Sequence, residues 1–143
     1  MTVASAGASE VSLLAVDTNV LLRVFINDDE LQHAASKRLL AQTAKAGHRI
    51  FVAIPVLCEM VWVLQARHKL SREACVALLD GLLDNTLFLV DQTSVVRAAL
   101  ARFEKQPGGF SDYLIAEIAA ANGAQPVYSN DRALLKSPGF AKP

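Results

Sequence analysis

LLAVDTN, at residues 13–19, is the segment of the sequence that decides the fold. Its four apolar residues in a row predict a buried β-strand. Apolar residues then return at helical spacing, which predicts a short helix over residues 20–25. Asp17 is therefore expected at the carboxyl end of a buried strand, at the turn into a helix. In open α/β sheets, ligands bind at that edge.

Short apolar runs and helical patterns alternate along the rest of the chain. Further strands are expected over Ile50–Ala53, Leu87–Val90 and Pro126–Ser129. The connections are long enough for crossovers, so the predicted class is α/β: a three-layer α/β/α sandwich around a central, mainly parallel sheet of four to five strands. Gln106–Gly109 is a loop whose glycines allow movement, and the ordered pattern ends at Pro138-Gly139. Helices are expected near residues 30–46, 55–67, 71–83, 93–103, 111–123 and 131–135.

Composition indicates one folded domain with a sizeable core. The chain has 143 residues, of which 52% are hydrophobic. Its 14 basic and 14 acidic residues balance, which argues against binding nucleic acid through overall charge but allows a local basic rim. Residues 1–12 are small and polar without an apolar signal segment, so they are expected to form a flexible tail ahead of a single domain at residues 13–140.

The two cysteines, Cys58 and Cys75, lie inside apolar helical patterns. Their spacing fits neither a zinc site nor a disulfide framework, so a reducing cytoplasm is the expected compartment. The most apolar window, Phe51–Leu64, is interrupted by Pro55 and Glu59, and no membrane span is expected.

Four acids stand at positions where a ligand could bind. Asp17 follows the first strand and Asp131 the fourth, while Asp112 lies in the first turn of its helix after a Gly-Gly-Phe segment. Glu59 interrupts an otherwise apolar helical run; such a helix is expected to be buried, and a buried carboxylate needs a partner. Each has a plain structural alternative: an N-cap for Asp17 and Asp131, a helix-dipole contact for Asp112, and a salt bridge to an Arg for Glu59.

The ends of the first and fourth strands and two helix starts can face one edge of a parallel sheet. Four carboxylates there would repel one another unless cations bridged them, and hard oxygen ligands suit Mg²⁺ or Mn²⁺. One such ion makes hydroxide at neutral pH and another stabilises the leaving oxygen. A carboxylate cluster that holds these ions could therefore catalyse phosphodiester hydrolysis. The three histidines are scattered, and the chain has no P-loop, Gly-x-Gly-x-x-Gly or Gly-x-Ser-x-Gly motif.

In this order, the acid-bearing segments resemble the PIN-domain family, specifically the VapC-type toxins of bacterial toxin–antitoxin pairs. The matching pieces are VDTNVLLR at residues 16–23, CE at 58–59, FSDYLIA at 110–116 and SNDR at 129–132. The resemblance covers roughly residues 13 to 140. The last piece departs from the usual Thr-Phe-Asp of the family, because it keeps the hydroxyl and the acid but lacks the aromatic residue.

The resemblance implies a function and a set of site residues. The acid quartet binding Mg²⁺ or Mn²⁺ would be Asp17, Glu59, Asp112 and Asp131. Thr18, Asn19 and Ser129 would be its polar supports. The activity implied is metal-dependent endoribonuclease cleavage of RNA that leaves a 5′-phosphate. The implied partners are a second copy in a homodimer and a VapB-type antitoxin, whose tail places a basic side chain near the acids.

Two further features bear on partners. Arg23, Arg132 and Lys136 lie close in sequence to acids and are predicted to steer the RNA backbone, with solvated helix faces as the alternative. The segment Val56–Leu83 holds more apolar residues than one sheet face can cover, which predicts a homodimer interface, with a thicker core as the alternative.

Two other classes of function remain open on these residues. One is a catalytically weak PIN-like module that binds RNA or another protein. The other is a receiver-like phosphotransfer domain, which would need a late Lys after a strand; here the fourth strand ends in Ser-Asn-Asp-Arg. Metal-dependent RNA degradation that is abolished by Asp17→Asn separates the ribonuclease from the binding module.

Overall fold

The computed structural model describes residues 11–143. Ten of the twelve residues of the predicted N-terminal tail lie outside this range. The chain forms two compact units: residues up to Met60 together with Asn85–Asp91, and Val61–Asp84 together with Gln92–Pro143. None of the helices within the described range is long and apolar enough to cross a membrane.

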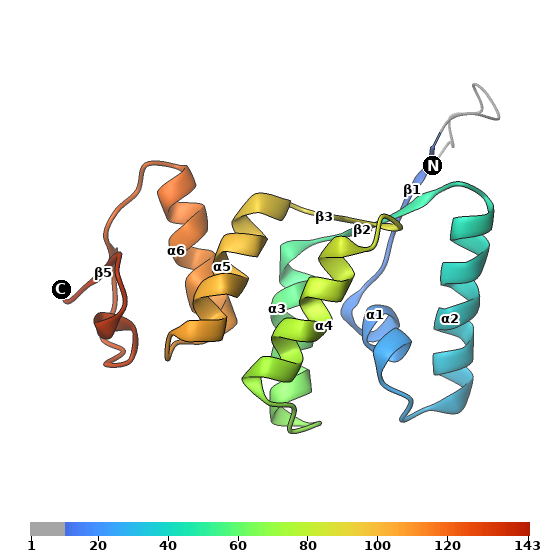
Figure 1. The fold of residues 1–143 in the computed structure, drawn as a ribbon, viewed down its shortest axis with the longest axis horizontal. Helices are drawn as coiled ribbons and strands as arrows, with labels where there is room; N and C mark the ends of the chain where they lie inside the picture. Colours follow the sequence, from blue (N-terminus) through green and yellow to red (C-terminus); the bar gives the residue numbers. More distant parts are fainter. Residues whose placement is uncertain (1–10) are drawn as a thin grey trace. The chain divides into compact units, whose positions relative to one another are not determined.

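The first unit is built on a three-stranded parallel sheet (Figure 1). Its strands are β1 (Leu13–Ala15), β2 (Arg49–Val52) and β3 (Phe88–Val90), in the spatial order β1-β2-β3. Leu14 is paired with Ile50, and Ile50 with Phe88. Because the strands are parallel, their carboxyl ends share one edge, which places the segments after β1 and β2 at the same side of the sheet.

The prediction that the first strand is buried is wrong. In β1, Leu13 is 53% exposed and Leu14 is 36% exposed. The reason is the place of β1 at the sheet edge, where it pairs with β2 alone among the strands of its unit. The alternating core positions come instead from β2 and β3, whose buried side chains are Ile50, Val52, Phe88 and Val90.

Three helices follow these strands. α1 (Thr18–Phe25) and α2 (Glu30–Lys45) contact each other beside the sheet (Figure 1). Asp29 is the N-cap of α2, and its carboxylate accepts a hydrogen bond from the Gln32 N–H. Gly47 follows the C-cap residue of α2 and has a φ of +73°. α3 (Ile54–Ala66) starts in the first unit and continues into the second.

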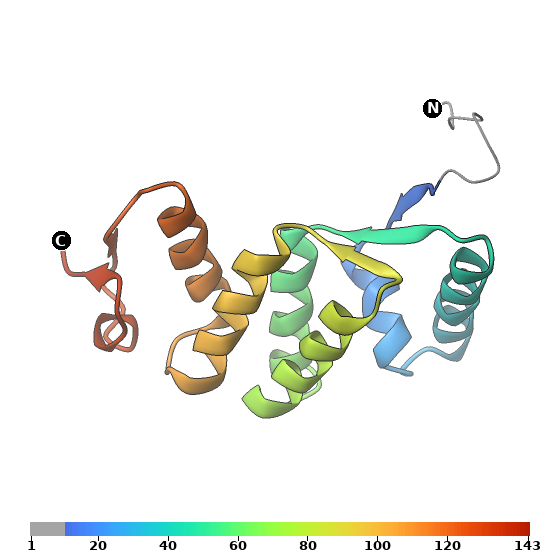
Figure 2. The same cartoon turned by 45° about the horizontal axis from the view of Figure 1, so that its top comes forward.

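The second unit is mainly helical. Its helices are α4 (Arg72–Asp84), α5 (Thr93–Lys105) and α6 (Phe110–Ala121), and α5 packs against both α4 and α6, as Figure 2 shows for α5 and α6. Every third or fourth residue on their facing sides is apolar, which produces a continuous core. Its largest fully buried side chains are Tyr113, Phe103, Leu79, Leu82, Leu114 and Val96.

The end of the chain holds a strand that the sequence did not predict. β4 (Val127–Tyr128) pairs in parallel with β5 (Phe140–Ala141), and the 3₁₀ helix η1 (Leu134–Lys136) lies between them in sequence. The prediction that order ends at Pro138-Gly139 is therefore wrong. The α/β class with parallel strands is confirmed; the five strands of the described residues form one sheet of three and a separate pair.

Candidate metal and catalytic residues

Asp17 follows β1 and caps α1. One carboxylate oxygen, Oδ1, accepts a hydrogen bond from the Val20 N–H at 2.9 Å. The N-cap interpretation of Asp17 is therefore geometrically correct. It leaves the second oxygen without a hydrogen bond from any of residues 11–143, at the carboxyl edge of the first sheet.

Glu59 is exposed, so the prediction that it is buried is wrong. Its predicted alternative, a salt bridge to an Arg, is also absent among the described residues; instead Oε1 accepts a hydrogen bond from the Thr18 hydroxyl at 2.8 Å. The reason is the orientation of α3, which buries one face of the helix and exposes another. The buried residues are Leu57, Met60, Val61 and Leu64, and the exposed ones are Pro55, Glu59, Trp62 and Ala66. In the first unit, Thr18 thus links the segment after β1 to α3, which follows β2.

Asp112 lies in the first turn of α6 in the second unit. Its Oδ2 accepts a hydrogen bond from the Gly109 N–H at 3.0 Å, which completes the backbone capping at the start of the helix. The preceding segment is held at several points: the Gly108 N–H donates to the Tyr113 hydroxyl at 2.8 Å, and Arg72 contacts the carbonyls around it. These contacts hold the Gly108 backbone in one conformation, while movement of this loop stays a prediction.

Asp131 lies between β4 and η1, also in the second unit. Its Oδ1 accepts hydrogen bonds from the N–H groups of Ala133 at 2.8 Å and Leu134 at 3.4 Å. The Ser129 hydroxyl accepts a hydrogen bond from the Asp131 N–H at 3.0 Å. Ser129 and Asp131 thus form one local turn, and Asp131 is exposed at its end.

The four acids have one property in common, which Asp29 at the start of α2 shares. Each has one oxygen fixed by a donor, while its other oxygen accepts no hydrogen bond from the described residues. None forms an ion pair with a Lys, Arg or His of residues 11–143, although Asp28, Asp84 and Glu117 are paired with Arg23, Arg97 and Arg102. Within either unit, no three His, Cys, Asp or Glu side chains of the described range lie close enough to hold a metal ion.

The basic residues predicted to contact RNA differ in their surroundings. Arg23 forms an ion pair with Asp28 at 2.8 Å and donates to Gln32 at 3.0 Å, so it is bound within the first unit. Arg132 and Lys136 are exposed and form no ion pair among residues 11–143. Asn19 is exposed as well, and its side chain has no hydrogen bond to another described residue.

Asp91 and the two cysteines are further residues with side chains that a functional site could use. Asp91 directly follows β3, at the same edge of the first sheet as Asp17, and the same signal of an acid after a strand could have drawn attention to it. Burial raises the pKa of the Cys58 thiol, and the adjacent Glu59 charge adds to the rise; burial likewise raises the pKa of the Cys75 thiol. Both thiols are therefore protonated at neutral pH and are poor nucleophiles.

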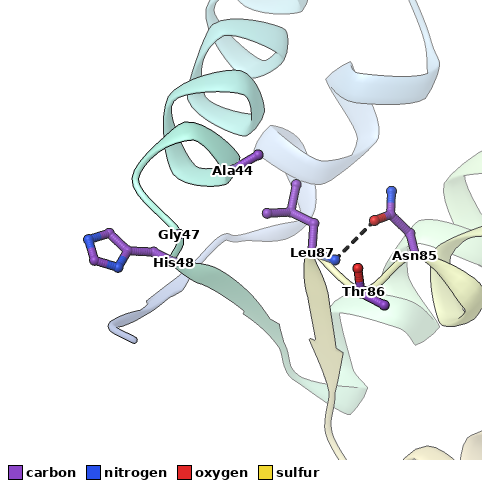
Figure 3. Close-up of a pocket in the computed structure, with 6 residues that line it drawn as sticks. All are labelled: Ala44, Gly47, His48, Asn85, Thr86 and Leu87. Carbon is purple, nitrogen blue, oxygen red and sulfur yellow. Dashed lines mark hydrogen bonds between the residues drawn. The ribbon is translucent and has the colours of Figure 1, made fainter. Parts of the chain in front are cut away.

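A pocket of about 430 Å³ lies at the opposite, amino-terminal edge of the first sheet (Figure 3). The end of α2 and the segment before β3 line it, and the His48 side chain points away from the other lining residues (Figure 3). Its lining contains no carboxylate, so it does not have the donors of a magnesium site. The lining residues are Ala44, Gly47, His48, Asn85, Thr86 and Leu87.

In an α/β chain with parallel strands, acids that follow the strands lie at the edge of the sheet where ligands bind. Residues 14–139 match the PIN domain family, and the chain belongs to that family. It is 28% identical, over 121 residues, to a VapC ribonuclease of Aquifex aeolicus, a match that covers 85% of this chain and 89% of the relative. The crystal structure of Mycobacterium tuberculosis VapC20, a toxin that cleaves the sarcin–ricin loop, matches with a TM-score of 0.43 and 22% identity, covering 90% of this chain and 96% of that one.

Proposed function

We propose that this protein is a metal-dependent endoribonuclease of the VapC type, the toxin of a toxin–antitoxin pair. The observation that carries the proposal is the state of the four motif acids. Asp17, Glu59, Asp112 and Asp131 each keep one carboxylate oxygen open and have no basic partner among residues 11–143. A carboxylate that binds a cation needs an open oxygen, and all four acids of the family motifs have one.

The donor set fits Mg²⁺ or Mn²⁺. Both ions prefer carboxylate oxygens, and an oxygen fixed by a hydrogen bond holds its partner oxygen in a defined direction. Asp17, Glu59 and Asp112 would bind the ion directly, and Asp131 directly or through water. When bound, the ion supplies hydroxide at neutral pH and stabilises charge on the leaving oxygen.

The residues around the acids have supporting roles. The Thr18 hydroxyl fixes Glu59, the Gly109 N–H fixes Asp112, and Ser129 shapes the turn that carries Asp131. The last motif lacks the aromatic residue that is usual in the family. We expect Asp131 to contribute less to the rate than the other three acids.

The ends of the cleaved RNA test the reaction directly. Attack by a metal-bound water leaves a 5′-phosphate and a 3′-hydroxyl, whereas attack by the RNA 2′-hydroxyl leaves a 2′,3′-cyclic phosphate and a 5′-hydroxyl. We expect 5′-phosphate ends, detected by ligation or by a 5′-phosphate-dependent exonuclease. Cyclic phosphate ends would refute the proposed reaction, and binding of RNA without cleavage would favour the catalytically weak module.

The relative's name indicates the partner class. A VapC protein is the toxin member of its pair, so we propose a VapB-type antitoxin as partner of this chain. An antitoxin side chain that carries positive charge would compete with the cation at the acids through charge-assisted hydrogen bonds. The Aquifex aeolicus relative is a ribonuclease by name, which supports RNA as the substrate.

The exposed basic residues lead to a prediction about RNA binding. Replacing Arg132 and Lys136 with Gln should weaken RNA binding and reduce the salt dependence of the dissociation constant by about one to two ions, because each phosphate contact releases counterions. Arg23→Gln should have a smaller effect on binding, since Asp28 already neutralises Arg23. The measurement is RNA affinity across a salt series. If the salt dependence of the dissociation constant is the same in the double variant as in the wild type, Arg132 and Lys136 do not contact RNA.

The exposed face of α3 leads to a prediction about self-association. Of the large apolar residues between Val56 and Leu83, Trp62 is the most exposed, at 66%. We expect it to lie in a homodimer interface, because a large exposed aromatic residue is a typical interface anchor. Light scattering should give a dimer for the wild type and a shift toward monomer for Trp62→Ser. A wild-type monomer of about 15 kDa at tens of micromolar would contradict the interface, and Leu31→Ser, at another exposed apolar site, serves as the control.

A further inference from the structure

Arg72, the first residue of α4, binds the segment that leads into α6. Its Nη1 donates to the carbonyl oxygens of Phe103 at 2.7 Å, Gln106 at 3.1 Å and Gly108 at 2.8 Å. Its Nη2 donates to the Pro107 carbonyl at 3.3 Å. One guanidinium therefore binds four backbone carbonyl oxygens from the end of α5 and the loop after it.

The position of Arg72 is unfavourable for its own helix. A cation near the amino end of a helix opposes the helix dipole, and the chain places Arg72 within the first turn of α4. The side chain also lies over the Phe103 ring, with Cζ 4.4 Å from the ring centroid. The carbonyl oxygens, which carry partial negative charge, offset this unfavourable position.

The loop that Arg72 holds ends at the amide that fixes Asp112. Gly108 is bound through its carbonyl to Arg72 and through its N–H to the Tyr113 hydroxyl, which in turn shares a hydrogen bond of 3.0 Å with Ser137. The next residue, Gly109, donates its N–H to Asp112 at 3.0 Å. The orientation of the Gly109 amide is set by the peptide plane it shares with the Gly108 carbonyl, the same carbonyl that Arg72 binds.

The Gly108 backbone is closely surrounded by side chains. A Cβ atom at Gly108 would meet the Leu134 side chain and would lie 2.7 Å from the Tyr113 hydroxyl. Arg102 supports the same region from the other side: it pairs with Glu117 at 3.1 Å, donates to the Gln106 side chain at 3.3 Å, and lies over the Tyr113 ring. The backbone before α6 is thus fixed by side chains from α4, α5 and α6.

We propose that Arg72 is a positioning residue for Asp112: through the Gly108 carbonyl it orients the Gly109 amide, which fixes the carboxylate in the direction needed to bind a cation. This inference rests on the proposed function for its consequence on catalysis, but its structural part does not. A Lys could not replace Arg72, because a single ammonium cannot reach four carbonyls that a planar guanidinium binds at once.

The test compares Arg72→Met, which keeps the apolar stem, with Arg97→Met, which removes only a surface ion pair with Asp84 in the same unit. We expect hydrogen exchange at the Gly108 and Gly109 amides to become at least about tenfold faster in Arg72→Met, with the exchange of core amides in α5 and α6 retained. We expect Mn²⁺ affinity to fall about tenfold or more, as for the loss of a group that orients a metal ligand. In RNA cleavage, kcat should fall while KM changes little; Arg97→Met should match the wild type, and Arg72→Lys should recover only part of the loss.

The outcomes separate this inference from the proposed function. If the Gly109 amide exchanges at the wild-type rate in Arg72→Met, or exchanges faster while Mn²⁺ affinity and kcat stay within about twofold of the wild type, the positioning role is refuted. A wild type that neither binds Mn²⁺ nor cleaves RNA would refute the proposed function, and Gly109 exchange would then decide the inference alone. If Arg72→Met does not fold, the same measurements on Arg72→Lys apply.

Discussion

Replacing Asp17 with Asn is expected to lower the rate of RNA cleavage by about 10³-fold or more, which corresponds to roughly 4 kcal/mol of activation free energy. Glu59→Gln and Asp112→Asn should have effects of similar size. The reason is loss of the negative charge that a hard cation requires from its ligands. Cleavage of a labelled RNA under single-turnover conditions measures the rate.

The amide variants of these acids remove the negative charge but can keep the local hydrogen bonds. Asn is as good a helix cap as Asp, so the bond from the Val20 N–H to residue 17 is retained. The Gln carbonyl can still accept from the Thr18 hydroxyl, and the Asn carbonyl from the Gly109 N–H. Loss of activity in these variants is therefore due to loss of the negative charge and not to loss of the fold. Circular dichroism spectra that match the wild type should confirm that the fold is retained.

A matched control is Asp84→Asn, since Asp84 is an exposed acid of the second unit that pairs with Arg97. It should retain wild-type cleavage, because exposed ion pairs contribute little to stability and Asp84 is not among the motif acids. A rate within about tenfold of wild type for any one of the three substitutions, worth only ~1.4 kcal/mol, would remove that residue from the site.

Adding Mg²⁺ or Mn²⁺ to the metal-free protein is expected to raise its thermal stability. A cation that binds only the folded state stabilises it by about 2.7 kcal/mol at a concentration about 100 times its dissociation constant. For a chain of this length that is a rise of several degrees in Tm. Differential scanning fluorimetry across a cation series, with Ca²⁺ as a comparison ion, measures the shift.

The same titration on the acid variants identifies the ligands. Asp17→Asn should show a smaller Tm shift with Mn²⁺, because one charged ligand is missing. An equal shift in the wild type and in Asp17→Asn would place the bound cation elsewhere. No shift at millimolar Mg²⁺ or Mn²⁺ in the wild type would count against the metal site as a whole.

The class of the fold could be predicted from the sequence because local patterns determine it. Short apolar runs that alternate with helical periods predicted parallel strands and most helices, and α2, for example, spans Glu30–Lys45 where a helix near residues 30–46 was predicted. Burial could not be predicted in the same way. The run at Leu13–Ala15 is apolar yet forms an edge strand, because strand order is decided by long-range pairing and not by the segment itself.

Glu59 illustrates the same limit for the site. Its apolar neighbours predicted a buried carboxylate, but a helix divides a nearly uniform sequence into a buried and an exposed face, and Glu59 lies on the exposed one. The local caps of Asp17 and Asp131 could be foreseen from short-range rules. The contacts of Arg72 could not, because they join residues more than 30 positions apart through backbone carbonyls, which leave no signal in the side-chain sequence.

The central claim is that carboxylates and a divalent cation cleave RNA, and its most direct test is the cleavage rate of one RNA as a function of Mn²⁺ concentration. We predict no cleavage in the presence of a chelator, a rate that rises to saturation as Mn²⁺ is added to the wild type, and a negligible rate for Asp17→Asn at every concentration. Cleavage that persists in the chelator, or equal rates for the wild type and Asp17→Asn, would contradict the account.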